Sequence, residues 1–136
     1  MKIPVDIALH KKRRELELVY EDGAVNLSFE FLRVMSPSAE VQGHTPEEAV
    51  LQVGKRLADI TGIELVGNYA VRLIFSDGHE SGIYSWDYFQ KLIEQHDELW
   101  NAYLNDLAKA GASREPNDPA NKPFEEKAKP KHKCSH

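Results

Sequence analysis

The sequence predicts an α+β fold, in which small antiparallel β-hairpin sheets precede a long C-terminal amphipathic helix packed on the sheet and a disordered tail. Two segments alternate between apolar and polar residues, and each turns at an Asp-Gly pair, at residues 22–23 and 77–78. Glycine accepts the positive φ that tight hairpin turns need. Apolar residues then recur at three- and four-residue spacing from Phe89 to Leu107, which is typical of an amphipathic helix.

The alternation sets the expected strands. Residues 15–20 and 24–29 flank the first Asp-Gly pair, and residues 69–75 and 79–84 flank the second. Shorter alternations at Val5–Leu9 and at Ile63–Leu65 predict one more strand in each half of the chain.

Capping and helix-breaking residues set the expected helix ends. Ser85 is suited to cap the long helix, Gly111 is suited to end it, and a break is expected near His96–Asp97. The segment Thr45–Leu57 begins with Thr-Pro-Glu-Glu, which favours a short helical turn, although Gly54 interrupts it.

Length and composition indicate one domain. The chain has 136 residues, 41% of them hydrophobic and 29% charged, with a net charge of −5. The folded body is expected over residues 3–111. Residues 112–136 are rich in proline and charge and poor in apolar side chains, so they are expected to be disordered. This tail carries Arg114 and five lysines against four carboxylates, a net of +2, which leaves −7 on the body.

These features exclude several classes of protein. An acidic body argues against nucleic-acid binding, which depends on neutralising phosphates. The basic run His10–Arg14 lies between two short strands and is interpreted as a solvated turn. No apolar run is long enough to cross a membrane, and no signal peptide is recognisable at the start, so a cytoplasmic location is expected. Cys134 is the single cysteine, which fits a reducing compartment.

Candidate chemistry rests on single residues, because no motif for a nucleophile, a phosphate or a metal is present. His79 is a candidate metal ligand. Glu40 and His44 are four residues apart, but Gly43 argues against a helix that would place them on one face. Ser36 and Ser38 offer hydroxyl groups with no evident general base. In the tail, histidines and a cysteine alternate without a surrounding structure to fix a metal geometry; they are His132, Cys134 and His136.

Three stretches resemble the gamma-butyrobetaine hydroxylase-like N-terminal domain family. They are Leu32–Val41, Val66–Val71 and Asp77–Trp86, and the last carries a specific Gly-Ile-Tyr-Ser-Trp run. The resemblance covers roughly residues 3–92. In the hydroxylases this domain precedes a separate oxygenase domain that holds the iron, so the resemblance implies no hydroxylation by this chain. A related domain is also appended to a plastid iron–sulfur scaffold protein, which suggests a link to metal-cluster handling.

The resemblance also implies the loss of a metal site. The hydroxylase domain holds structural zinc through a Cys-x-Cys-x-x-Cys run and a later histidine. This chain has Ser36, Ser38 and Val41 in place of the cysteines, and retains only His79. Hydroxyl and valine side chains do not replace thiolates, so no cofactor is expected and the body is expected to fold without zinc. His79 is then expected to make a hydrogen bond where the relatives bind metal. The alternative is a weaker iron or zinc site formed by His79 with Glu40 or His44.

We therefore expect a non-catalytic accessory domain that binds an unknown protein partner, with metal binding as the alternative function. The candidate interaction residues are Arg33, Tyr84 and Trp86. Trp86 opens the long helix among other aromatic residues, so we expect it to be buried where helix meets sheet. An exposed Trp86 would instead be a partner-binding residue. The sequence leaves the oligomeric state and the biological process open.

Overall fold

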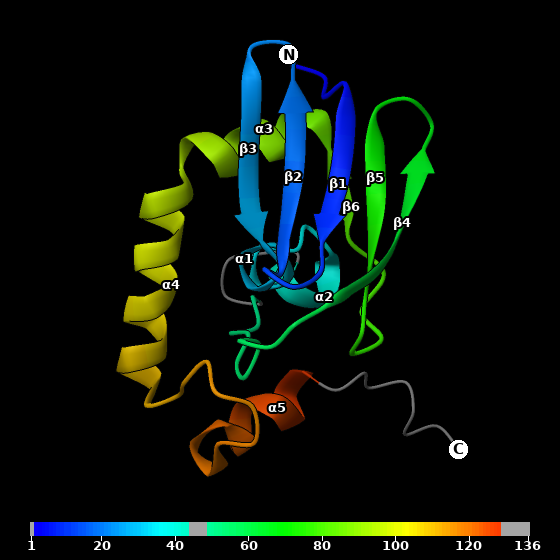
Figure 1. Ribbon diagram of the computed structural model, residues 1–136. Helices are drawn as coiled ribbons and strands as arrows, with labels where there is room; N and C mark the ends of the chain where they lie inside the picture. Colours follow the sequence, from blue (N-terminus) through cyan, green and yellow to red (C-terminus); the bar gives the residue numbers. More distant parts are fainter. Residues whose placement is uncertain (1, 44–48, 129–136) are drawn as a thin grey trace, which may run out of the picture.

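Figure 1 shows the computed structural model, in which residues 2–43 and 49–128 are described. Its elements in chain order are β1 (Asp6–His10), β2 (Glu15–Tyr20), β3 (Gly23–Ser28), α1 (Phe29–Val34), α2 (Ala39–Gln42), β4 (Ile60–Val66), β5 (Ala70–Phe75), β6 (Ile83–Ser85), α3 (Trp86–Glu94), α4 (His96–Ala110), a 3-10 turn (Pro119–Asn121) and α5 (Lys122–Ala128). The predicted α+β class is confirmed. Among the described residues, no helix combines the length and the apolar character needed to span a membrane.

The first sheet has the order β1-β2-β3, with every pair antiparallel. On β2, Leu16, Leu18 and Tyr20 point into the core and alternate with less buried residues. The turn to β3 places Gly23 at φ +145°, a conformation that glycine adopts without strain. The sequence therefore predicted this hairpin correctly, because one face of the sheet is buried and the other is not.

The second sheet has the order β4-β5-β6 and is also antiparallel. Its central strand buries Val71, Leu73 and Phe75 on one face. At the second Asp-Gly pair, Gly78 has φ +89° and its N–H donates to the Phe75 carbonyl at 3.0 Å. This turn starts the loop that leads back to the short strand β6.

The predicted long helix is two helices. The Ser85 hydroxyl caps α3 by accepting from the Tyr88 N–H at 3.1 Å, and Gly111 ends α4 in the left-handed conformation. The chain breaks at Gln95, next to the expected position. In Figure 1, α3 crosses behind the first sheet and α4 runs away from it along one side.

The two helices have different packing partners. The buried face of α3 joins residues of both sheets in one apolar core. By contrast, α4 packs on α1, where the rings of Trp100 and Phe31 lie 6.2 Å apart, and it forms a second cluster with Val34 and Val53. Only the first half of the predicted helix therefore covers the sheets directly.

The expected helical turn at Thr45–Leu57 is wrong over the residues that the structure describes. Ala49–Leu57 is not helical, and residues 44–48 lie outside the described part of the chain. Gly54 has φ +66°, and the N–H groups of Gly54 and Arg56 donate to the carbonyls of Ser113 and Arg114 at 3.0 Å each. These backbone donors bond to a distant segment, so they are not used within a helix.

The expected boundary at residue 111 also needs correction. Residues 112–128 are described and lie against the body, with Asn121 fully buried and Arg114 paired with Glu30. Composition reports only the capacity for apolar burial, whereas this segment is joined to the body by backbone hydrogen bonds and by ion pairs of Arg114 and Glu115. Residues 129–136, with His132, Cys134 and His136, lie outside the described residues.

Trp86 is buried, as predicted. Its side chain is 5% exposed, its indole N–H donates to the Asn68 carbonyl at 2.9 Å, and its ring stacks on Phe89 with centroids 6.3 Å apart. It therefore joins the start of α3 to the β4–β5 hairpin and to the core.

We predict that Trp86→Ala lowers the free energy of unfolding by about 3–5 kcal/mol, because it removes a large buried ring and the donor that pairs with the Asn68 carbonyl. Urea denaturation followed by circular dichroism measures the change. Tyr69→Ala is the matched control, since Tyr69 is 53% exposed, and it should cost less than about 0.5 kcal/mol. A loss below about 1 kcal/mol for Trp86→Ala would contradict the packing described here.

Candidate functional site

Two loops meet beside the core, one after α1 and the other between β5 and β6. The Ser36 hydroxyl and the His79 Nε2 atom lie 2.8 Å apart, and both side chains are buried. The Ser36 oxygen also accepts from the Ser38 N–H at 3.3 Å. The hydrogen bond expected for His79 is therefore present, and it links two loops that are 43 residues apart.

A second layer of hydrogen bonds supports this contact. The Ser81 hydroxyl lies 3.0 Å from the Ser38 hydroxyl and 3.1 Å from a Glu40 carboxylate oxygen. Gly82 lets the loops approach, because a Cβ atom there would lie 2.5 Å from the Ser36 hydroxyl oxygen. Any larger residue at position 82 would force the two loops apart.

Glu40 lies on α2, a single turn that the sequence analysis considered unlikely. Ser38 caps this turn by accepting from the Glu40 N–H at 3.0 Å, and Gly43 ends it with φ +69°. Gly43 thus terminates a short helix and does not prevent one. Glu40 Oε1 lies 3.4 Å from His79 Nδ1, so these two predicted site residues are brought together. The third, His44, lies outside the described residues.

His79 contacts the Ser36 hydroxyl through one ring nitrogen and the Glu40 carboxylate through the other, an arrangement that resembles the serine–histidine–carboxylate triads of hydrolases. The sequence analysis found no base for the serine, and the structure provides one. A nucleophile must also reach its substrate, and Ser36 has no exposed area. The cluster therefore has the geometry of a buried structural network, in which each hydroxyl has a partner.

The surroundings of His79 disfavour the charged form of its ring and lower its pKa. Burial lowers the pKa of His79, and the nearby Arg33 guanidinium lowers it further. Burial by itself would raise the pKa of Asp77, but Arg33 and Lys55 outweigh that effect and hold the Asp77 pKa below its usual value. The pKa of Lys55 is lowered by burial and by Arg33. Asp77 is thus the shared counter-ion of two cations.

These residues do not fit a structural zinc site. Ser36 and Ser38 supply hydroxyls that are already hydrogen-bonded, and Val41 supplies a buried apolar side chain. Among the described residues, no group of three or more histidine, cysteine and carboxylate side chains could hold a metal ion. Because thiolates provide most of the affinity of such sites, the hydrogen bonds of His79 take the place of a metal bond.

The three candidate interaction residues are buried and offer no surface to a partner. Arg33 is 7% exposed, and donates to Asp77 at 3.0 Å and to the Gln52 side chain at 2.9 Å. Tyr84 has no exposed area, and its hydroxyl donates to the Leu32 carbonyl. Trp86 packs in the core. Their polar groups serve internal contacts, so the interpretation of these residues as a docking surface is wrong.

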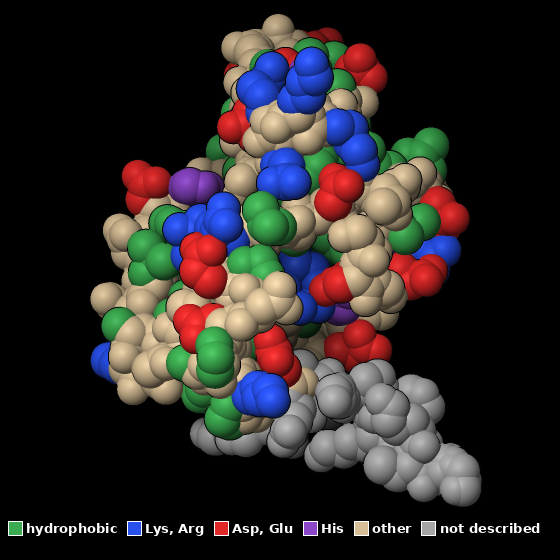
Figure 2. All heavy atoms as spheres, turned by 60° about the horizontal axis from the view of Figure 1, so that its bottom comes forward, with side chains coloured by type: hydrophobic (Ala, Val, Ile, Leu, Met, Phe, Trp, Pro, Cys, Tyr) green, Lys and Arg blue, Asp and Glu red, His purple; other side chains and the backbone are tan. Residues whose placement is uncertain are grey.

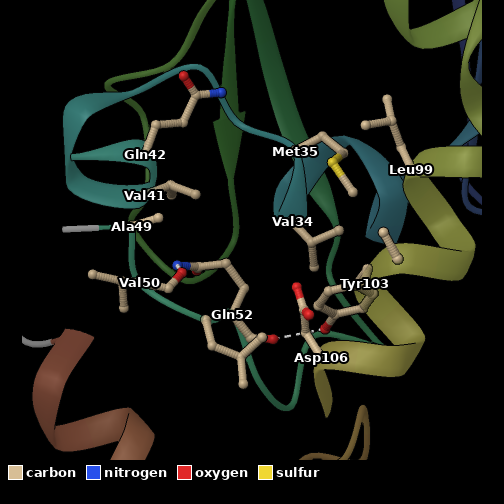
Figure 3. A pocket seen from close by; sticks show the side chains of 12 residues that line it. Val34, Met35, Val41, Gln42, Ala49, Val50, Gln52, Leu99, Tyr103 and Asp106 are labelled. Atoms are coloured by element: carbon tan, nitrogen blue, oxygen red, sulfur yellow. Dashed lines mark hydrogen bonds between the residues drawn. The ribbon is translucent and has the colours of Figure 1, made fainter. Parts of the chain in front are cut away.

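An apolar groove that the sequence analysis missed lies between α4, α1, α2 and the segment at residues 49–52 (Figure 3). Its volume is about 510 Å³. The apolar side chains that line it include Val34, Met35, Val41, Val50, Leu99 and Tyr103. Residues 99, 102, 103 and 106 recur at three- and four-residue spacing, so they share one face of the helix. This face adjoins the apolar stripe that predicted the helix, and it was the signal in the sequence for the groove.

We predict that the stability conferred by His79 is lost on acidification. In the unfolded chain, His79 takes up a proton at its ordinary pKa of 6.5, whereas the pKa of His79 in the folded chain is lower. The unfolded state therefore binds more protons as the pH falls below that value, and unfolding is favoured. Urea unfolding at about pH 8 and about pH 5.5 should show the advantage of the wild type over His79→Gln shrinking at the lower pH. An advantage that is constant or grows on acidification would contradict this.

Solved structures confirm the fold. Two structures determined by NMR in solution are 50% and 44% identical to this chain, with TM-scores of 0.74 and 0.73. The first match covers 87% of this chain and 94% of the other, and the second covers 85% and 87%. A crystal structure of a protein of unknown function from Acidithiobacillus ferrooxidans, assigned to the DUF971 family, is 36% identical with a TM-score of 0.54. That match covers 65% of this chain and 90% of the other.

No curated protein matches the chain. The family model described as gamma-butyrobetaine hydroxylase-like, N-terminal, matches residues 7–90, which include both sheets and most of α3. The matched region contains the Ser36–His79 contact and ends before α4. The chain therefore belongs to the gamma-butyrobetaine hydroxylase-like, N-terminal family.

Proposed function

We propose that this chain is a non-catalytic accessory domain that binds a protein partner through the apolar groove. The observation that supports this function is the groove itself, an open apolar hollow of about 510 Å³ beside α4. Apolar surface that is concentrated in a concave site favours the docking of apolar side chains.

The walls of the groove favour apolar side chains over polar ligands. The Tyr103 hydroxyl donates to the Gln52 carbonyl at 2.7 Å, so both groups are already paired (Figure 3). Leu99, Val34 and Met35 line the same side as Tyr103, across from Val41 and Val50 (Figure 3). A partner would gain mainly from burying apolar area, at roughly 25 cal/mol per Å² before the costs of association.

The charges favour a partner segment with basic residues next to its apolar ones. Asp106 lies on the wall of the groove, and Asp97 and Glu98 are in the first turn of the same helix. Residues 1–111 carry a net charge of −7, from the chain total of −5 less the +2 of residues 112–136. Charge complementarity of this kind steers association and selects among partners.

The buried serine supports an accessory function over catalysis. Within the described residues 2–43 and 49–128, Ser36 is aligned with a histidine and a carboxylate but has no exposed area. The groove is lined by apolar and amide side chains together with Asp106, and Ser36 is not part of it.

A second candidate function is metal binding, with a link to iron or iron–sulfur handling. It rests on the distance of 3.4 Å between His79 Nδ1 and Glu40 Oε1, which keeps two potential ligands together. Known zinc sites use three or four protein ligands, so a site with only two protein ligands would bind the metal more weakly. We therefore place this function second.

We predict that Ala102→Arg abolishes binding of the partner. Ala102 is exposed and lines the groove, so a long charged side chain would fill it without disturbing the core. A photo-crosslinking residue at position 102 in native cells captures the partner, whose affinity is then measured with both purified proteins. The expected loss for Ala102→Arg is at least about 10-fold. Ala108→Arg is the control, because Ala108 is exposed on the same helix and is not part of the groove. Equal affinity of the two variants would refute the proposal.

We also predict that the melting temperature is unchanged by EDTA. The full chain is required, because residues 112–128 contact the body, and replacing His132, Cys134 and His136 together removes the potential ligands of the terminus. Elemental analysis should find less than one equivalent of iron or zinc. Stoichiometric metal that survives dialysis and is lost in His79→Gln would establish the second function instead.

A further inference from the structure

The backbone of Ser113 and Arg114 lies against the segment Gly54–Arg56 and is joined to it by two hydrogen bonds. The N–H groups of Gly54 and Arg56 donate to the carbonyls of Ser113 and Arg114, each at 3.0 Å. Both bonds are donated by the body and accepted by the segment, so the main chain of the body helps to hold residues 113 and 114 in place. Gly54 has φ +66°, a conformation that glycine adopts without strain and that lets this segment present its N–H groups to Ser113 and Arg114.

Arg114 is held by two side chains of the body. Its guanidinium donates to both carboxylate oxygens of Glu30 at 2.7 Å, and it lies 5.3 Å from the centre of the Trp100 ring. Glu30 is 7% exposed. A buried carboxylate beside an aromatic face is a specific receptor for arginine, because the planar guanidinium fits both groups at once.

The segment also has a shape of its own. The Asn121 side chain accepts from the Ser113 N–H at 2.8 Å and donates to the Glu115 carbonyl at 3.0 Å. These bonds close residues 113–121 into a loop that presents Arg114 to the body. A segment ordered in this way loses less entropy when it binds.

The residues that hold Arg114 all precede it in the chain. Glu30 and Gly54 lie within the family match over residues 7–90, whereas Trp100 and Arg114 lie beyond it. The face of the molecule seen in Figure 2 intersperses basic and acidic side chains, so recognition here depends on individual pairs and not on one field of charge.

We infer that Glu30, Trp100 and the Gly54–Arg56 backbone form a recognition site for an arginine in a peptide segment, and that Ser113–Glu115 occupies it as a tethered ligand. A partner segment that carries an arginine displaces residues 113–115. The tether gives the internal segment an effective concentration in the millimolar range, so only a partner with further contacts competes. This site is separate from the apolar groove and does not depend on it.

Amide hydrogen exchange in the full chain tests whether the segment opens independently. Arg114→Gln and Glu30→Gln should each speed exchange of the Gly54 and Arg56 amides by at least about 10-fold, while the β5 amides are unchanged. Arg72→Gln is the control, because Arg72 pairs with Glu64 on the exposed side of the second sheet. If exchange of the β5 amides is accelerated as much as exchange of the Gly54 and Arg56 amides in both variants, the segment is an integral part of the core and the inference is wrong.

A peptide with the sequence of residues 112–119 tests the displacement. Added at millimolar concentration to the full chain carrying Arg114→Gln and Asn121→Ala, it should restore slow exchange at Gly54 and Arg56. The same peptide with glutamine in place of its arginine should not. Equal effects of the two peptides, or no effect of either, would overturn the assignment of an arginine site.

Discussion

The fold depends on one constraint, which is that its two three-stranded sheets are not joined by strand pairing in the described chain. Side-chain packing must therefore hold them together. The junction of β6 and α3 provides it, because Tyr84, Trp86 and Phe89 pack in the core that both sheets share. The Tyr84 hydroxyl also donates to the Leu32 carbonyl and so joins α1 to β6. Apolar packing and a buried hydrogen bond here replace the backbone ladder of a continuous sheet.

The loops around His79 solve a related problem by polar means. The loop after α1 and the loop before β6 meet at the Ser36–His79 contact. In this chain Ser36, Ser38 and Ser81 tie the same loops through hydrogen bonds. A fully paired network is stable when buried, since each polar group recovers the bonds that it lost to water. The price is pH sensitivity, because His79 must remain neutral.

The sequence predicted what depends on local patterns. Alternation around the first Asp-Gly pair revealed the β2–β3 hairpin, and Ser85 and Gly111 marked the outer ends of the helices. After the second pair the strand begins only at Ile83 and not at the expected residue 79, because the chain first passes through the loop that carries His79. Contacts between distant residues were missed, for physical reasons. The order of residues on the chain does not show that Glu40 approaches His79, because α2 is only four residues long. The docking of residues 112–128 was missed because polar pairing leaves no periodic apolar signal.

The burial of Arg33 and Tyr84 shows a further limit of sequence reasoning. Both residues belong to the stretches that resemble the family, and such residues are read equally well as functional or as structural. The contacts decide between these interpretations, since Arg33 joins Asp77 and Gln52 inside the protein. The reverse holds for the residues of the groove. Nothing in the sequence singles out Leu99 and Ala102, and only the elements packed around them show that they line a groove.

The pairing of Glu30 with Arg114 has a consequence for biosynthesis. The two residues are 84 positions apart, so the carboxylate leaves the ribosome well before its partner. At about 5–20 residues per second, the delay is roughly 4–17 s. During that interval both hairpins can form, but Glu30 must stay hydrated or meet another cation. Closure of residues 112–121 over Glu30 therefore comes after the strands of both sheets have been synthesised.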